Sequence, residues 1–354
     1  MTEELIPKEI HETPVAIRAT IQNTRLAARK AAKKMRFFKP RRIFFIGNGT
    51  SYYSSIAAAY LGRELAKPDD PLVVAMPSGD FRYFRPSLNN RDVVIGVTAS
   101  GEFRDVLAVF EELKGKCLCI GITHVPDSSV TKLADMILVS HGGQSSVPVM
   151  TKTYATTLTA AYLLILEFFN ASQEVYSELS EAADKCELAL SEVQDQLADI
   201  VSGLGEFDSG YYFGNGSGYA SAMEAALKMK EMALFHAEGC ESWEMASGPA
   251  TMVNKSTVCF ALYTGDRTDA AVAKLAGNVK DWGALVVEVG PVAQVGDLFL
   301  KITPQVRSVF APLVLVPTLA LLAYRFARNR DIDPNRPNWR ERYLAQGMTH
   351  IMGE

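Results

Sequence analysis

Ile46-Gly-Asn-Gly-Thr-Ser-Tyr-Tyr-Ser-Ser55 returns in the second half of the chain as Phe213-Gly-Asn-Gly-Ser-Gly-Tyr-Ala-Ser-Ala222. The two copies lie 167 residues apart, and nine of twenty positions are identical between residues 47–66 and 214–233. Each copy has a short apolar run, the tripeptide Gly-Asn-Gly and an alanine-rich stretch, which is the pattern of a strand, a glycine loop and a helix. A spacing close to half of the 354 residues indicates that one folding unit occurs twice.

The composition is that of a folded chain with no dominant charge. Hydrophobic residues make up 48% and charged residues 21%, and 36 Lys and Arg face 40 Asp and Glu. We therefore expect no nucleic-acid partner. The longest apolar run, residues 309–324, is shorter than a membrane span and is interrupted by proline, so we expect a buried helix and no membrane association. The first residues lack the basic and apolar parts of a secretory signal, which predicts a cytoplasmic protein.

Both halves alternate short apolar runs with helical segments. The strand candidates are residues 43–46, 72–75, 93–98, 118–123 and 136–139 in the first half, and 211–213, 258–262, 285–289 and 298–302 in the second. Such alternation predicts an α/β protein in which each half is a parallel β-sheet flanked by helices on both faces.

These patterns divide the chain into two tandem domains and three further segments. We expect an N-terminal helical segment (1–35), a first domain (36–172), a helical linker (173–203), a second domain (204–330) and a C-terminal tail (331–354). The tail is rich in Pro, Asn and Arg, which favours an extended segment that reaches over a site.

Hydroxyl-rich loops in the first half are candidates for binding a phosphate. Residues 47–51 and 98–105 each follow a strand and open a helix, and their hydroxyls come from Thr50, Ser51, Thr98 and Ser100. Loops at the carboxyl ends of neighbouring strands converge on one site, and helix N-termini favour anions. A tight turn without a ligand would explain either loop alone. A third cluster, residues 151–157, could be helix capping. All three together favour phosphate recognition.

Acid and base candidates lie in the second half. Glu224, Lys228 and Glu231 are spaced i, i+4, i+7, which puts them on one helical face. A surface ion-pair stripe is the alternative. The rest of this helix is mostly apolar, however, and charged groups on an inward face need partners or a pocket. A buried carboxylate with a raised pKa could move a proton between adjacent sugar carbons.

We expect no metal site and no cofactor. The five histidines include no pair at ligand spacing, and Cys117 and Cys119 lie in an apolar run that reads as core. His236, close to the charged helix, is equally well explained as an acid or as a structural histidine.

At these residues the chain resembles the sugar isomerase (SIS) superfamily, in particular the isomerase half of the glutamine–fructose-6-phosphate aminotransferases. The matching segments, in order, are residues 8–17, 49–51, 78–83, 100–102, 151–152, 224–231, 236–238, 248–249, 321–324 and 331–333. Their order and spacing over the whole chain are more specific than any single segment.

The resemblance implies two tandem SIS domains, and a homodimer whose active site is shared between subunits. Carried over by position, four side chains would hold the sugar 6-phosphate: Thr50, Ser51, Thr98 and Ser100. Glu231 matches the carboxylate that moves the proton between C1 and C2 of the sugar. Glu224 and Lys228 match the charged residues that support it.

The chain departs from the family at several of these positions. Ser247 stands where the family has a ring-opening histidine, and no lysine follows Lys301 where the family forms an imine. Ala99 and Phe103 replace two polar residues of the phosphate loop. The possible substitutes for the missing acid are Lys228, Glu238, Ser247 and His350. The sequence given has no glutaminase domain before the SIS pair, so glutamine-driven synthesis by this chain alone is not expected.

Three functions follow, from two classes. The first is an enzyme that moves a C1/C2 proton on an amino-sugar or ketosamine 6-phosphate, like a glucosamine-6-phosphate deaminase or isomerase. A fructosamine-6-phosphate deglycase is the alternative, although deglycases also rely on the histidine absent at Ser247. The third is a phosphosugar-binding sensor without catalysis. The complete triplet on the charged helix argues against this last function.

Overall fold

A computed structural model describes residues 4–145, 147–303 and 305–336. Of these, residues 15–145 and 152–180 form one compact unit, called here the first unit. Residues 4–14, 147–151 and 181–336 form the second unit. Each unit contains one copy of the Gly-Asn-Gly repeat, so the duplication seen in the sequence is a duplication of folded units.

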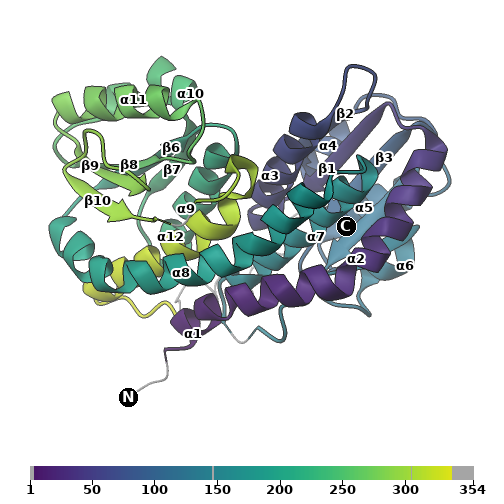
Figure 1. The fold of residues 1–354 in the computed structure, drawn as a ribbon, viewed down its shortest axis with the longest axis horizontal. Coiled ribbons are helices and arrows are strands. Elements are labelled where there is room, and N and C mark those ends of the chain that lie inside the picture. Colours follow the sequence, from purple (N-terminus) through teal and green to yellow (C-terminus); the bar gives the residue numbers. More distant parts are fainter. Residues whose placement is uncertain (1–3, 146, 304, 337–354) are drawn as a thin grey trace. The chain divides into compact units, whose positions relative to one another are not determined.

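The first unit is built on a five-stranded parallel sheet with the order β2-β1-β3-β4-β5 (Figure 1). Its strands are β1 (Arg42–Gly47), β2 (Leu72–Pro77), β3 (Asp92–Val97), β4 (Leu118–Thr123) and β5 (Met136–Val139). Strands β1, β3 and β4 are apolar and buried along nearly their whole length, as is typical of strands covered on both faces. Cys117 and Cys119 lie in this core, as expected.

Helices cover both faces of the first sheet. They are α2 (Thr13–Phe38), α3 (Thr50–Leu65), α4 (Ser78–Phe84), α5 (Arg104–Leu113), α6 (Ser129–Leu133) and α7 (Lys152–Phe168). Helices α3 and α7 pack on each other and on the sheet, whereas α4, α5 and α6 enclose a separate core around Phe44, Phe81 and Phe110. The expectation of helices on both faces is confirmed.

The second unit repeats this architecture with the sheet order β10-β9-β8-β6-β7 (Figure 1). Its strands are β6 (Ser209–Gly214), β7 (Ala237–Glu241), β8 (Thr257–Leu262), β9 (Leu285–Gly290) and β10 (Leu298–Lys301), and all pair in parallel. Helices α9 (Ser217–Ala233) and α12 (Pro312–Asn329) pack together on the side of Tyr212 and Phe260. Helices α10 (Ser242–Ser247) and α11 (Asp269–Asp281) close the core around Tyr211 and Phe213.

Both sheets have the same order when their strands are counted along the chain, 2-1-3-4-5. In such a sheet the connections leave in opposite directions from the first and third strands. The loops that follow these two strands therefore flank a crevice, and ligands bind there in open α/β sheets. The crevice lies beyond β1 and β3 in the first unit and beyond β6 and β8 in the second.

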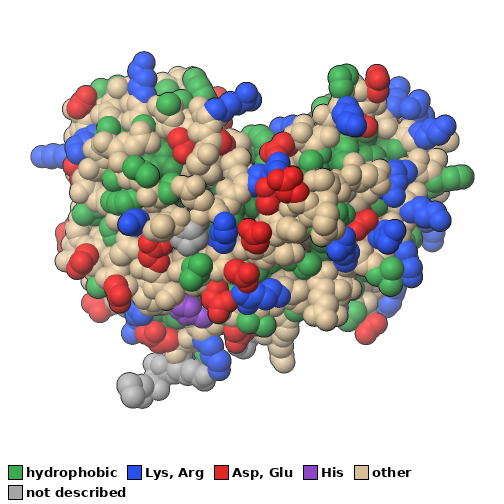
Figure 2. Space-filling model, in the orientation of Figure 1, with side chains coloured by type: hydrophobic (Ala, Val, Ile, Leu, Met, Phe, Trp, Pro, Cys, Tyr) green, Lys and Arg blue, Asp and Glu red, His purple; other side chains and the backbone are tan. Residues whose placement is uncertain are grey.

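The remaining helices and the chain end complete the fold. They are α1 (Leu5–His11), α8 (Gln173–Gly203) and two short 3-10 helices, η1 (Pro249–Met252) and η2 (Ser308–Phe310). Within the described residues, no helix is both long and apolar enough to cross a membrane. On the face drawn in Figure 2, acidic and basic side chains both lie among uncharged ones. Most of the predicted C-terminal tail, residues 337–354, lies outside the described residues.

Strand β7 is absent from the expected strands. Its sequence, Ala-Glu-Gly-Cys-Glu, has no apolar run, and it pairs with β6 at the edge of the second sheet. Gly239 lets it approach α9 closely, since a Cβ atom at this position would lie 2.5 Å from the Cα atom of Met223.

Candidate active site

The loop between β1 and α3 places Thr50 and Ser51 at the first turn of α3. Gly47 must lack a side chain, because a Cβ atom there would lie 2.9 Å from the Cβ atom of Ser51. Gly49 takes a positive φ of 51°, and the Ser51 N–H donates to the Asn48 carbonyl at 3.1 Å. The two hydroxyl residues are buried at a helix N-terminus, where the helix dipole favours an anion.

The loop between β3 and α5 holds Thr98 and Ser100. Gly101 has a φ of 72°, and its N–H donates to the carbonyl and the hydroxyl oxygen of Thr98 at 3.1 and 3.2 Å. Thr98 is buried, whereas Ser100 is exposed and accepts a hydrogen bond from the Glu102 N–H at 3.2 Å. Because β1 pairs directly with β3, both predicted loops lie at neighbouring strand ends beside the crevice of the first unit.

A buried hydrogen-bond network joins these loops to the one after β2. The Asn48 amide and the Ser78 hydroxyl both donate to one carboxylate oxygen of Asp105, and the Ser78 N–H donates to the Asn48 side-chain oxygen at 3.2 Å. The second Asp105 oxygen accepts from the Val106 N–H at 2.9 Å. Sequence reasoning gave these residues no role. Asn48 could have been found, because the same asparagine recurs at Asn215 in the second copy.

The charged triplet of the second unit forms one cluster on α9. The Lys228 ammonium lies 3.1 Å from a Glu224 carboxylate oxygen and 2.5 Å from one of Glu231. The side chains of Glu224 and Lys228 are 0% and 1% exposed, whereas that of Glu231 is 28% exposed. Burial alone would lower the pKa of Lys228, but the two carboxylates outweigh it and raise this pKa above its ordinary value. Lys228 is therefore a fixed positive charge between two carboxylates.

The other acid candidates lie outside this cluster. The Ser247 hydroxyl is exposed and donates to the Trp243 carbonyl at 2.7 Å. Glu238, on the edge strand β7, is exposed and lies 3.6 Å from the ring of His236. His350 lies outside the described residues.

The family follows from a comparison of the whole chain with known protein families. The SIS domain matches residues 36–167 and 208–289, which include both Gly-Asn-Gly loops, the whole first sheet, and the second sheet up to β9 but not its edge strand β10. The chain belongs to the SIS domain family. Each of its two units carries one of the two SIS matches.

Relatives of this SIS protein include enzymes of amino-sugar metabolism. The glutamine–fructose-6-phosphate aminotransferase (isomerizing) of Thermococcus kodakarensis is 30% identical over 97% of this chain. The chain spans only 57% of the length of that relative. The C-terminal domain of the glucosamine–fructose-6-phosphate aminotransferase from Francisella tularensis superposes with a TM-score of 0.85 at 22% identity, covering 94% of this chain and 98% of that one. The glucosamine-6-phosphate deaminase from Thermotoga maritima superposes with a TM-score of 0.78 at 25% identity, covering 95% and 98%.

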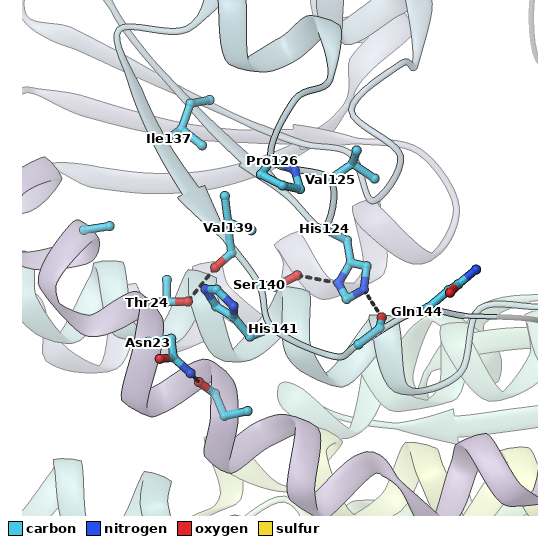
Figure 3. A pocket seen from close by; sticks show the side chains of 13 residues that line it. Asn23, Thr24, His124, Val125, Pro126, Ile137, Val139, Ser140, His141 and Gln144 are labelled. Carbon is cyan, nitrogen blue, oxygen red and sulfur yellow. Dashed lines mark hydrogen bonds between the residues drawn. The ribbon is translucent and has the colours of Figure 1, made fainter.

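A cavity of about 850 Å³ lies elsewhere in the first SIS unit (Figure 3). It is lined by α2, by β5 and by the segments that follow β4 and β5. The His124 ring, on its wall, lies 3.2 Å from the Ser140 hydroxyl and 2.6 Å from the Gly143 carbonyl. The residues predicted to bind phosphate do not line this cavity.

Proposed function

We propose that this SIS protein is a phosphosugar enzyme that moves a proton between C1 and C2 of an amino-sugar or ketosamine 6-phosphate. It would act as a glucosamine-6-phosphate deaminase or isomerase and would not itself use glutamine. The observation that carries the proposal is the Glu224–Lys228–Glu231 cluster, because two carboxylates around a buried ammonium have no evident structural purpose in a mostly apolar helix. The similar aminotransferases and the similar deaminase are all named for a sugar 6-phosphate.

The phosphate would bind at the two loops of the first unit. Thr50 and Ser51 supply hydroxyls at the first turn of α3, and Thr98 and Ser100 supply them from the adjacent loop. The Asn48–Ser78–Asp105 network supports this arrangement, because its hydrogen bonds tie the loop after β1 to the start of α4 and to the start of α5. Ala99 and Phe103 reduce the number of polar contacts that the family's loop would offer.

Glu231 is the better base of the two carboxylates. Its side chain is partly exposed and can reach a substrate, whereas Glu224 is enclosed. In glucosamine 6-phosphate with an open ring, Glu231 would take the proton from C2 and return it to C1, while a proton passes from the C2 amine to O1. The product is a C2 imine, and water converts it to the ketone with release of ammonia. Lys228 would hold the carboxylates in place as a charge and would not act as a base.

Ring opening and imine formation need groups other than those used in the family. Serine is a poor proton shuttle, and the Ser247 hydroxyl already donates to a carbonyl. Glu238 and His350 are the remaining candidates for an acid. This departure favours deaminase or isomerase chemistry over the deglycase alternative, which depends on a histidine at the position of Ser247.

We also propose that the protein is a homodimer whose subunits share the active site. Light scattering on the purified protein tests whether it is a dimer.

The decisive experiment incubates the purified chain in D₂O with glucosamine 6-phosphate, with fructose 6-phosphate plus ammonia, and with fructosyl-lysine 6-phosphate. Deuterium at C1 or C2, measured by NMR, reports proton transfer even when no amine is released. Ammonia release identifies the deaminase, and lysine release identifies the deglycase. If calorimetry shows tight binding of these sugars while neither deuterium exchange nor turnover is detected, the proposal of an enzyme is wrong and the phosphosugar-binding sensor is favoured.

Glu231→Gln should abolish deuterium exchange and leave sugar-phosphate affinity within about a factor of three, since the phosphate contacts are in the other unit. Glu206→Gln, the same change at an exposed position of the second unit, serves as the control and should exchange at the wild-type rate. Full activity in Glu231→Gln would exclude this residue as the base.

A further inference from the structure

The second unit repeats the loop network of the first unit without its acceptor. In the first unit, the Ser78 N–H donates to the Asn48 side-chain oxygen at 3.2 Å. In the second, the Ser242 N–H donates to the Asn215 side-chain oxygen at 3.1 Å. Asn215 and Ser242 are thus the structural counterparts of Asn48 and Ser78.

The counterpart of Asp105 is an alanine. Helices α5 and α11 show the same spacing of buried residues: Val106, Val109, Phe110 and Leu113 in the first, and Val272, Leu275, Ala276 and Val279 in the second. This alignment puts Ala271 where α5 has Asp105. The carboxylate that accepts from Asn48 and Ser78 in the first unit is therefore missing from this position in the second.

The two donors that Asp105 satisfies in the first unit are unsatisfied in the second. Within the described residues, neither the Asn215 side-chain nitrogen nor the Ser242 hydroxyl has a hydrogen-bond partner. Both residues are deeply buried, at 4% and 3% exposure. Buried donors without an acceptor are destabilising and rare in folded proteins, so these two indicate a group that completes the site.

A cavity borders Ser242 and Ala271, on the side of the network where that group would be, although Asn215 is not part of its lining. Its volume is about 230 Å³, and its lining includes Ser242 and Ala271 together with Lys274 and Trp243. Lys274 brings a positive charge, and the Trp243 ring offers an apolar wall. The cavity has room for a molecule of several heavy atoms, since one water occupies about 30 Å³ in the liquid.

We propose that this cavity binds a small carboxylate, whose oxygen takes the place that the Asp105 carboxylate has in the first unit. The Asn215 amide and the Ser242 hydroxyl donate to it, Lys274 balances its charge, and its apolar part lies against Trp243. The same chain already uses a carboxylate with this donor pair, which favours a carboxylate over a phosphate. The inference does not rest on the proposed function, because it uses no residue of the charged triplet and no phosphate loop.

The test uses acetate as the probe on the full chain. Saturation-transfer NMR should show the acetate methyl group in contact with the wild-type protein. Compared with chloride at equal ionic strength, acetate at about five times its dissociation constant should raise the melting temperature by about 2–4 °C.

Ala271→Asp supplies the missing carboxylate from the chain itself. It should raise the melting temperature without acetate and remove the acetate response, and Ser242→Ala should weaken that response severalfold. The matched control is Ala270→Asp, which adds the same charge at the exposed neighbouring position and should leave the response intact. No acetate response in the wild type, an unchanged response in Ala271→Asp, or a response to inorganic phosphate alone would each overturn the proposal.

Discussion

Gly101 shows how one residue determines the shape of the second phosphate loop. Its φ is 72°, and a Cβ atom would lie 1.9 Å from the Ser128 hydroxyl oxygen and 2.3 Å from the Ser128 Cβ atom. Gly115 has nearly the same φ, 76°, with no atom within 4 Å of its added Cβ. The two glycines therefore separate backbone strain from steric overlap.

We predict that Gly115→Ala lowers the free energy of unfolding by about 1 kcal/mol, which is the cost of a positive φ. Gly101→Ala should cost about 3 kcal/mol or more, because Ser128 must also move. Urea unfolding measures both values, and equal losses would contradict the predicted clash.

Lys228 is the residue on which the charged cluster depends. Lys228→Met leaves the enclosed Glu224 carboxylate without its cation, and we expect a loss of about 3–5 kcal/mol in the free energy of unfolding. The double variant Glu224→Leu/Lys228→Met removes both charges and should recover most of that loss. If the double variant is less stable than Lys228→Met alone, loss of the Lys228 charge beside the buried Glu224 carboxylate is not the cause.

Among the secondary-structure elements, the neighbouring strands β1 and β3 are joined by an ion pair between their first residues, Arg42 and Asp92. The guanidinium donates to the two carboxylate oxygens at 2.7 and 2.8 Å, and the Asp92 side chain is fully buried. Burial alone would raise the pKa of Asp92, but the hydrogen bonds from Arg42 and the Asn89 N–H lower it below its ordinary value.

This pair should make the first unit sensitive to acid. A lowered carboxyl pKa contributes stability that is complete above the ordinary pKa of about 3.9 and is lost as the pH falls through the folded value. We predict that Asp92→Asn lowers the free energy of unfolding by about 3 kcal/mol at neutral pH. Urea unfolding of the variant and the wild type near pH 7 and in acid measures this loss. If the difference in unfolding free energy between the two proteins is as large in acid as at pH 7, the ionised Asp92 carboxylate is not its source.

For the molecule as a whole, the two copies of the repeat differ in the hydroxyl groups at the start of the helix. Ser217, the counterpart of Thr50, donates its hydroxyl to the Ser308 carbonyl, and Gly218 stands where the first copy has Ser51. The second copy thus has fewer hydroxyls available for a phosphate. Hydrogen exchange with and without glucosamine 6-phosphate should show protection at residues 47–51 and 98–101, and no change at 214–217. Equal protection of both copies would place phosphate binding in both units.

Much of the fold could be predicted from local pattern. Continuous apolar runs such as those of β1 and β4 identify strands that are buried on both faces, and the repeated Gly-Asn-Gly identifies the turn into α3 and α9. Strand β7 could not be found in this way, because pairing with β6 and close contact with α9, not hydrophobicity, make it a strand.

The amino-acid pattern was sufficient to predict the duplicated α/β unit and the common helical face of Glu224, Lys228 and Glu231. The first follows from the same motif recurring 167 residues later, and the second from spacings within two turns of one helix. The packing of the folded chain encloses Glu224 and leaves Glu231 accessible. It also lets Asp105 close the Asn48–Ser78 network, whereas Ala271 leaves Asn215 and Ser242 without an acceptor among the described residues. The contacts of the Asn48–Ser78–Asp105 network join residues that lie 27 to 57 positions apart along the chain. They exist only because the parallel sheets bring the carboxyl ends of their strands to one edge.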